Sequence, residues 1–239
     1  MAPSALLERE TVNEKLDMTT AFALVSHDIK NSLGVLLKDI GTITENCIAS
    51  NCTMRQNSAE MEYEVRRINN NLVKMLTLFK IGAGEYLLNL DAHSVSDFLE
   101  EIMLEQSALL QQKGISYEID CGQELYCYFD RNLMTGVMGN AISNALRYTK
   151  DKLLITAAES KQGLTIVVED NGSGFPPFML EQQAEFQRPE SGFLNNNTGL
   201  GLYFTQQVLD MHGHDDLRGR VELSNGGTLG GGRLTILLP

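Results

Sequence analysis

Two long apolar stripes in the first third of the sequence restrict the fold more than any other feature. The polar segment between them, residues 46–58, predicts the turn of an antiparallel helical hairpin. One hairpin buries its stripes poorly, whereas two copies bury them in a four-helix bundle. We therefore expect a homodimer, built on residues 1–81. The stripes have the gaps of three and four that define one helix face, and they are formed by Phe22, Val25, Ile29, Leu33, Leu36, Ile40 and Ile43, and by Met61, Val65, Ile68, Leu72, Met75 and Phe79.

The pattern changes after about residue 92, where helical and strand-like segments alternate. Gly82 and Gly84 interrupt the helical pattern, so we interpret residues 82–92 as a linker. The order of segments beyond it predicts an α/β sandwich over residues 93–239, with a mixed sheet and helices on one face. The expected segments are helices at 94–113, 130–148 and 200–212, a polar loop at 171–198, and strands at 115–120, 125–129, 153–159, 164–170, 220–224 and 233–239.

Charge and composition exclude several classes of function. The net charge of −12 disfavours nucleic-acid binding, which needs a basic surface to offset phosphates. No apolar run reaches the roughly 18 residues of a membrane helix, and no secretory leader opens the chain. We therefore expect a soluble, cytoplasmic protein without membrane insertion. The cysteines, Cys47, Cys52, Cys121 and Cys127, lack the spacing of a metal site and are interpreted as ordinary reduced thiols.

The segment SHDIKNSL carries a candidate nucleophile. His27 lies two positions from both Val25 and Ile29, so it faces away from the apolar stripe. Asp28 is adjacent, and Asn31 shares the same face of the helix. A carboxylate beside an exposed imidazole can orient or accept the ring proton. The alternative is a histidine on a solvated helix face.

The segment GNAISNALRYTK carries candidate ligands for a nucleotide. Asn140 and Asn144 are four residues apart and share a helix face, and Arg147 and Tyr148 follow one turn later. Amide oxygens can bind Mg²⁺, a guanidinium can bind phosphate, and a phenol ring can cover a base. The alternative is a set of solvated side chains on a helix.

Two glycine pairs mark further candidate loops. Asp170 ends a strand-like run and is followed by Gly172 and Gly174, which allow a ligand to approach the backbone. Gly199 and Gly201 precede an apolar-periodic helix, whose N-terminal amides suit an anion. Neither pair is specific by itself, and DNGSG is also consistent with a plain turn. No GxxxxGK[ST] motif occurs, which excludes a P-loop ATPase.

The order of these four segments is more specific than any one of them. HDxKN, NxxxNAxRY, DxGxG and GxGL before a helix resemble the H, N, G1 and G2 boxes of sensor histidine kinases. The linker and the glycine-rich end, GGTLGGGRLTILLP, also resemble that family, so the similarity covers nearly everything after about residue 15. It implies a dimerisation and phosphoacceptor domain followed by a GHKL-type ATP-binding domain.

The resemblance implies a role for each matched residue. His27 would be the phosphoacceptor, Asp28 the general base, and Asn31 the residue that orients a water to hydrolyse the partner's aspartyl phosphate. Asn144 would bind Mg²⁺, and Asp170 would bind the adenine amino group. The whole nucleotide-binding set would be Asn140, Asn144, Arg147, Tyr148, Asp170, Gly172, Gly174, Gly199, Leu200 and Gly201.

The implied activity is Mg²⁺-ATP-dependent autophosphorylation of His27 and phosphotransfer to the aspartate of a response regulator. The stimulus would come from a separate sensor protein or a missing sensor domain. Two positions depart from the family: Ser32 replaces a common proline, and the phenylalanines of segment 175–198 match its F-box only loosely.

Three alternatives stay open. A serine kinase of the anti-sigma type would share the ATP fold but leave the hairpin and His27 without a role. A scaffold with a decayed ATP domain should have lost the paired glycines or Asp170, which are present. A protein that acts mainly as a response-regulator phosphatase would use Asn31, with ATP as an allosteric ligand.

Overall fold

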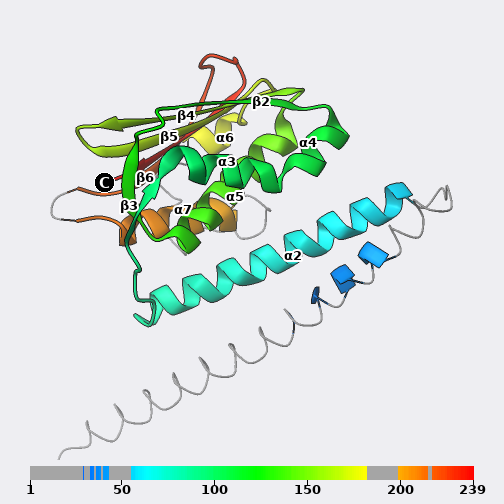
Figure 1. The fold of residues 1–239 in the computed structure, drawn as a ribbon, viewed down its shortest axis with the longest axis horizontal. Helices are drawn as coiled ribbons and strands as arrows, with labels where there is room; N and C mark the ends of the chain where they lie inside the picture. The colour runs from blue at the N-terminus through cyan, green and yellow to red at the C-terminus, as the bar shows by residue number, and fades with distance from the viewer. Residues whose placement is uncertain are drawn as a thin grey trace, which may run out of the picture. The chain divides into compact units, whose positions relative to one another are not determined.

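The computed structural model describes residue 29 and residues 33–34, 36–38, 40–42, 55–181, 199–214 and 217–239 (Figure 1). The chain divides into two compact units, Met1–Tyr86 and Leu87–Pro239. His27, Asp28, Asn31 and Ser32 lie outside the described residues, so their predicted roles stay predictions.

The first unit contains the long helix α2, Arg55–Gly82. Gly84 ends it with a φ of 70°, and the Glu85 N–H donates to the Lys80 carbonyl, as in a Schellman cap. The apolar stripe of α2 is only partly covered within one chain, since Ile68 is 48% and Met75 44% exposed. Among the described helices, none combines the length and apolarity needed to cross a bilayer.

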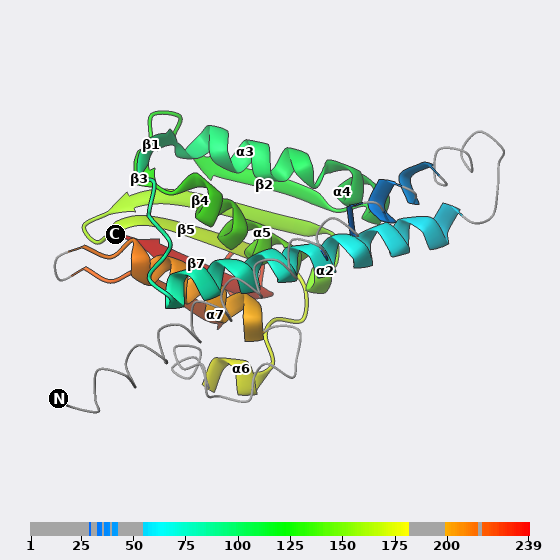
Figure 2. The same ribbon diagram turned by 90° about the horizontal axis from the view of Figure 1, so that it is seen from below.

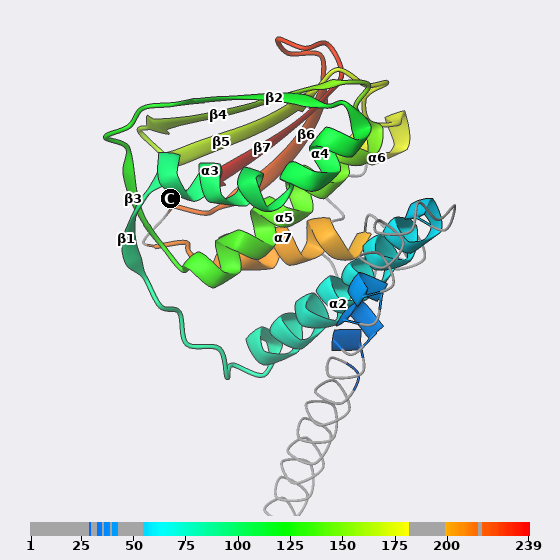
Figure 3. The same ribbon diagram turned by 45° about the vertical axis from the view of Figure 1, so that its right-hand side comes forward.

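The second unit is a layered α/β structure. Its five-stranded sheet has the order β2-β4-β5-β7-β6; β2 and β4 are parallel, and the other neighbouring pairs are antiparallel. Helices α3, α5 and α7 cover one face of this sheet (Figures 2 and 3). The predicted mixed sheet with helices on one face is therefore confirmed, whereas the four-helix bundle stays a prediction. The elements are β1 (Asp91–Ser94), α3 (Val95–Glu105), α4 (Ser107–Lys113), β2 (Ser116–Cys121), β3 (Tyr126–Phe129), α5 (Arg131–Tyr148), β4 (Lys152–Ser160), β5 (Gly163–Asp170), α6 (Pro177–Glu181), α7 (Gly199–Met211), β6 (Arg220–Asn225) and β7 (Gly232–Leu238).

The core lies between the sheet and the helices. Burial alternates along β4, while β5 is buried along most of its length because it is the central strand. Ile155 and Ile166 of the sheet, and Met138 of α5, are fully buried. Each such side chain stabilises the fold by about 1.5–3 kcal/mol relative to an exposed one.

The structure differs from the sequence prediction at three elements. The single helix expected at 94–113 is two helices, because α3 ends at Glu105 and α4 begins at Ser107. Residues 91–94, placed at the end of the linker and the start of that helix, form β1, whose pairing with β3 makes a separate two-stranded sheet. The loop expected at 171–198 contains the short helix α6, which begins at Pro177, a residue favoured in the first helical turn.

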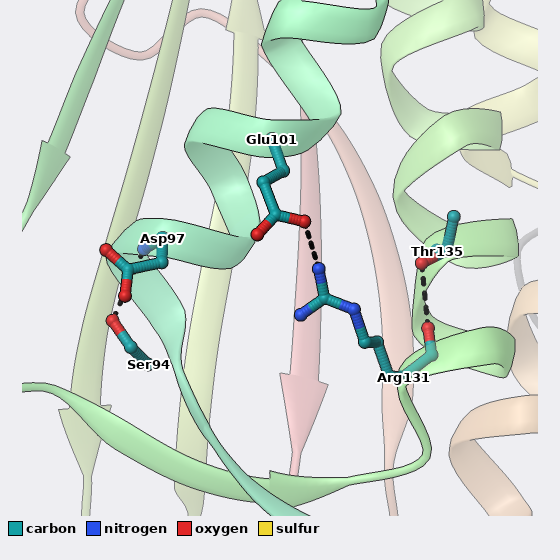
Figure 4. A network of polar contacts seen from close by, with 5 residues as sticks. All are labelled: Ser94, Asp97, Glu101, Arg131 and Thr135. Atoms are coloured by element: carbon teal, nitrogen blue, oxygen red, sulfur yellow. Dashed lines mark hydrogen bonds and ion pairs between the residues drawn. The ribbon is translucent and has the colours of Figure 1, made fainter.

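Polar contacts join α3 to α5 (Figure 4). The Ser94 hydroxyl accepts from the Asp97 N–H and caps α3. Glu101 of α3 forms an ion pair with Arg131 at the start of α5, while the Thr135 hydroxyl donates to the Arg131 carbonyl. Because Glu101 and Arg131 are largely exposed, their pair contributes about 1 kcal/mol at most.

Asp130 connects the linker to the ends of α5 and α7. Its carboxylate accepts from the Leu133 N–H at the start of α5, over 3.1 Å, and from the Asn89 N–H of the linker, over 3.1 Å. Its own N–H donates to Nε2 of His212, over 3.0 Å. Nδ1 of His212 must then carry the ring proton, which it donates to the Val208 carbonyl. The fold therefore holds His212 in its neutral form.

This buried histidine should make stability depend on pH. Burial lowers the pKa of His212, and this outweighs the raising effects of the Val208 hydrogen bond and the Asp130 charge. The contribution of His212 to the free energy of unfolding should be complete above the ordinary histidine pKa of about 6.5 and should decline below it. As the pH falls, this histidine is protonated in the unfolded chain before it is protonated in the folded protein.

Thermal unfolding of the wild type and His212→Gln checks this dependence. Glutamine keeps a donor and an acceptor but does not titrate, so the wild type should lose more stability between about pH 7.5 and about pH 5.5. Equal losses in the two proteins would show that His212 does not carry the dependence.

Candidate functional site

Asp170 is the last residue of β5, the central strand of the sheet. It is 4% exposed, and its Oδ1 accepts from the Gly172 N–H over 2.7 Å and from the Gly232 N–H over 3.3 Å. Its backbone carbonyl accepts from the Gly231 N–H. Backbone amides therefore fix the orientation of a buried carboxylate at the end of the central strand.

Gly172 brings the loop after Asp170 against the C-terminal end of α5. A Cβ atom at Gly172 would lie 2.0 Å from the Tyr148 carbonyl oxygen and 2.8 Å from Asp170 Oδ1. Only a glycine allows this approach of two backbone segments. The segments carrying Tyr148 and Asp170, which are 22 positions apart, are therefore in direct contact.

Asn171, which is not among the predicted site residues, fixes the same contact. Its Oδ1 accepts from the Thr149 hydroxyl and from the N–H groups of Lys150, Asp151 and Lys152, at 3.0–3.2 Å. Its Nδ2 donates to the Asp151 carboxylate over 2.7 Å. An asparagine between an acid and a glycine suggests a turn, but only the structure shows that this one anchors the connection from α5 to β4.

Asn140 lies between α5 and α7. It is 7% exposed, and its Nδ2 donates to the Thr205 hydroxyl over 3.4 Å; that hydroxyl donates to the Gly201 carbonyl. A Cβ atom at Gly201 would lie 2.2 Å from Asn140 Oδ1. The structure thus gives Asn140 and Gly201 a shared packing role that holds the first turn of α7 against α5.

The other residues of α5 proposed as ligands are more accessible. Asn144, one turn after Asn140, is half-buried. Arg147 is exposed, and its guanidinium carbon lies 5.6 Å from the centroid of the Tyr148 ring, which is 40% exposed. An amide, a guanidinium and a phenol ring therefore lie on the last two turns of α5.

The second glycine pair begins α7. Gly199, Leu200 and Gly201 form its first turn, where N–H groups have no acceptor within the helix. An anion near these amides would also be favoured by the helix dipole. Gly174, with a φ of 79°, lies in the loop after Asp170, in a conformation that favours glycine.

The structure thus joins three of the four sequence motifs. Contacts link the asparagine motif of α5 to both glycine motifs, through Tyr148 with Gly172 and through Asn140 with Gly201. The histidine motif lies outside the described residues, as do Phe186 and Phe193 of the segment 175–198, whereas Phe178 is exposed on α6.

Glu169 is a second buried acid, and it was not among the predicted site residues. It is 4% exposed; its carboxylate accepts from the N–H groups of Thr228 and Leu229 and lies 3.6 Å from Nε of Arg233. It anchors the connection between β6 and β7 next to Asp170. Two consecutive acids at the end of a buried strand were the signal that could have identified it.

These groups fit a nucleotide with its metal. The buried carboxylate of Asp170 suits an amino group of a base, and the N-terminal turn of α7 and Arg147 suit phosphates. Among the described residues, no group of three or more His, Cys, Asp or Glu side chains could hold a metal ion. A Mg²⁺ ion bound mainly by phosphates and water, with Asn144 as one ligand, does not require such a group.

Comparison with known proteins identifies the fold. The family model of histidine kinase-, DNA gyrase B-, and HSP90-like ATPases matches residues 129–239. Sensor protein SrrB of Staphylococcus aureus is 24% identical over 197 residues, which cover 80% of this chain and 34% of SrrB. The chain therefore spans about a third of the length of the curated relatives it matches.

Several solved histidine kinases have a similar fold. The catalytic domain of histidine kinase ThkA superposes with a TM-score of 0.52 at 19% identity, over 63% of this chain and 95% of that one. Acinetobacter baumannii histidine kinase AdeS gives a TM-score of 0.56 at 19% identity, over 84% and 95% of the two chains. Full-length ShkA in complex with AMPPNP gives 0.61 at 19% identity, over 92% of this chain and 46% of ShkA.

These likenesses confirm the resemblance to sensor histidine kinases through the ATP-binding domain, whereas the role of the histidine motif stays a prediction. Residues 129–239 form an ATPase domain of the histidine kinase, DNA gyrase B and HSP90 type, and the chain is a homologue of sensor histidine kinases.

Proposed function

We propose that this protein is an ATP-dependent histidine kinase that phosphorylates His27 and passes the phosphoryl group to an aspartate of a response regulator. The observation that carries the proposal is that α5 contacts both glycine motifs: Tyr148 at its end contacts Gly172, next to the buried, oriented carboxylate of Asp170, and Asn140, two turns earlier, contacts Gly201. ShkA, which shares the fold, was solved in complex with AMPPNP, an ATP analogue.

The described residues would bind the two ends of ATP. Asp170 would accept a hydrogen bond from the exocyclic amine of adenine, with Tyr148 beside the base. Arg147 and the first turn of α7, which includes Gly199, Leu200 and Gly201, would bind the phosphates. Mg²⁺, held by Asn144, would neutralise phosphate charge.

The transfer itself would need few groups. A ring nitrogen of His27 would attack the γ-phosphorus, the bond to the oxygen bridging the β- and γ-phosphorus atoms would break, and ADP would leave. Asp28 would take the ring proton, so that charge does not build up on the imidazole. The same phosphoryl group would then move to an aspartate carboxylate of the receiver domain. Asn31 would orient a water molecule that hydrolyses this aspartyl phosphate and so ends the signal.

The proposed assembly is a cytoplasmic homodimer built on residues 1–81, followed by a linker, 82–92, and the ATP-binding domain, 93–239. Partly exposed apolar residues on α2, including Ile68 and Met75, support burial against a second copy. The stimulus would reach the dimer from a separate sensor protein or from a sensor segment outside this chain.

Incubation with γ-labelled ATP and Mg²⁺ tests the proposal. The wild type should acquire a label that is lost in acid and stable in base, as expected for phosphohistidine. His27→Ala should abolish the label because it removes the nucleophile. His214→Ala is the matched control: this exposed histidine lies after α7 and should be dispensable.

Three other outcomes would contradict this assignment of kinase activity to His27. ATP binding without any label in the wild type would favour the partner phosphatase or the scaffold. A label that persists in His27→Ala would show that another residue is the acceptor. Loss of label in His214→Ala as well would show that the assay reports folding and not the acceptor.

A further inference from the structure

The β6–β7 hairpin contacts both ends of the loop that follows Asp170. Asn225, the last residue of β6, lies opposite Gly232, the first residue of β7. The Gly232 N–H donates to Asp170 Oδ1 where the loop begins, and the Asn225 side chain bonds to Phe175 where it ends. One cross-strand pair therefore contacts both ends of residues 170–175.

Asn225 makes two hydrogen bonds to a single residue. The Phe175 N–H donates to Asn225 Oδ1 over 2.7 Å, and Asn225 Nδ2 donates to the Phe175 carbonyl over 2.8 Å. The side-chain amide thus satisfies both backbone groups of Phe175, as a neighbouring strand would. We call this pair of bonds the Asn225 clamp.

The glycine before Phe175 is matched to this clamp. Gly174 has a φ of 79°, and a Cβ atom there would lie 2.7 Å from Asn225 Oδ1. A side chain at Gly174 would therefore be strained and would displace the clamp. The second glycine of the DNGSG motif is needed for the approach of Asn225 as well as for its own backbone conformation.

The hairpin itself does not need the side chain of Asn225. Its end is closed by the Gly226 N–H, which donates to the Gly231 carbonyl over 2.8 Å, and by Glu169, which accepts from the Thr228 and Leu229 amides. Asn225 is exposed. Its carboxamide thus bonds to the loop while other groups hold the hairpin.

We propose that Asn225 is a positioning residue of the nucleotide site. It fixes the end of the DNGSG loop, so that Gly172 stays close to the carboxylate of Asp170. This inference rests on the proposed binding of ATP next to Asp170. It extends the site to a residue 50 positions beyond Phe175, in the C-terminal hairpin.

Titration calorimetry with ATP on the full chain tests the role of Asn225. Asn225→Ala removes both bonds, and Asn225→Asp keeps the size but has no N–H to donate. Both should raise the Kd for ATP about 5- to 10-fold, with unchanged stoichiometry and melting temperature. Ser224→Ala, an exposed neighbour on β6, is the matched control and should bind as the wild type does.

Hydrogen exchange of the loop in nucleotide-free protein gives an independent reading. The Phe175 amide should exchange faster in Asn225→Ala, which removes its acceptor, and at the wild-type rate in Ser224→Ala. Faster exchange together with weaker ATP binding would support the proposal. Faster exchange with an unchanged Kd would overturn it, because the clamp would then not matter to the nucleotide.

Two more outcomes would overturn it. Lower stoichiometry or melting temperature at constant Kd would mean that Asn225 only supports folding. Unchanged exchange and unchanged Kd would mean that the clamp holds nothing, while the proposed function would stand. Absence of ATP binding by the wild type would refute the proposed function itself, and this inference with it.

Discussion

Asp170→Ala should abolish ATP binding and, with it, any phosphohistidine label. The substitution removes the carboxylate proposed to hold the adenine amine. It also removes the acceptor of the Gly172 and Gly232 N–H groups, which lie around a side chain only 4% exposed. Leaving such groups without an acceptor costs about 1–3 kcal/mol of stability. Titration calorimetry and thermal unfolding would measure the two effects separately.

Two other variants show which effect dominates. Asp170→Asn keeps the size and one acceptor oxygen, so its melting temperature should be close to that of the wild type. It should nevertheless bind ATP at least about 10-fold more weakly, because an N–H group would face the adenine amine. Asp120→Ala, an exposed acid in β2, should change neither property. Wild-type affinity in Asp170→Asn would contradict the adenine role of Asp170.

Gly172→Ala should damage stability and nucleotide binding together. The added methyl group would lie 2.0 Å from the Tyr148 carbonyl oxygen and 2.7 Å from its carbonyl carbon, and both atoms belong to the backbone. The loop or the end of α5 must therefore shift, which costs about 1–3 kcal/mol. The shift would separate Asp170 from Tyr148, so the Kd for ATP should rise by more than about 10-fold.

Gly122→Ala is the matched control for this prediction. Gly122 is also outside helices and strands, and a Cβ atom there would meet nothing within 4 Å. It should leave ATP binding unchanged and alter stability by less than about 1 kcal/mol, in the stabilising direction, because alanine restricts the unfolded chain. Equal behaviour of the two variants would show that the contact at Gly172 carries no constraint.

Local sequence patterns predicted the elements that carry the nucleotide site. The helix expected at 130–148 is α5, Arg131–Tyr148, and the helix expected at 200–212 is α7, Gly199–Met211. Asp170 ends β5, the strand expected at 164–170. Periodicity, capping and glycine spacing act within a few residues, so these elements can be recognised without knowledge of distant contacts.

The residues that join these elements could not be predicted in the same way. Asn171 and Asn225 look like ordinary turn residues, and their roles depend on groups brought close by the sheet. The strand β1 has only four residues and owes its conformation to pairing with β3. The break between α3 and α4 follows no glycine or proline, so the sequence contained no local signal for it.

The position of β7 in the sheet has a consequence for synthesis of the protein. β7 lies between β5 and β6, so β5 has no neighbour on that side until β7 leaves the ribosome. Until then the nascent chain exposes an unpaired edge that includes Ile166 and Val168, both buried in the final fold. Such an edge is a template for aggregation. Ribosome-bound chains arrested before β7 should therefore bind holdase chaperones more strongly than chains arrested beyond it.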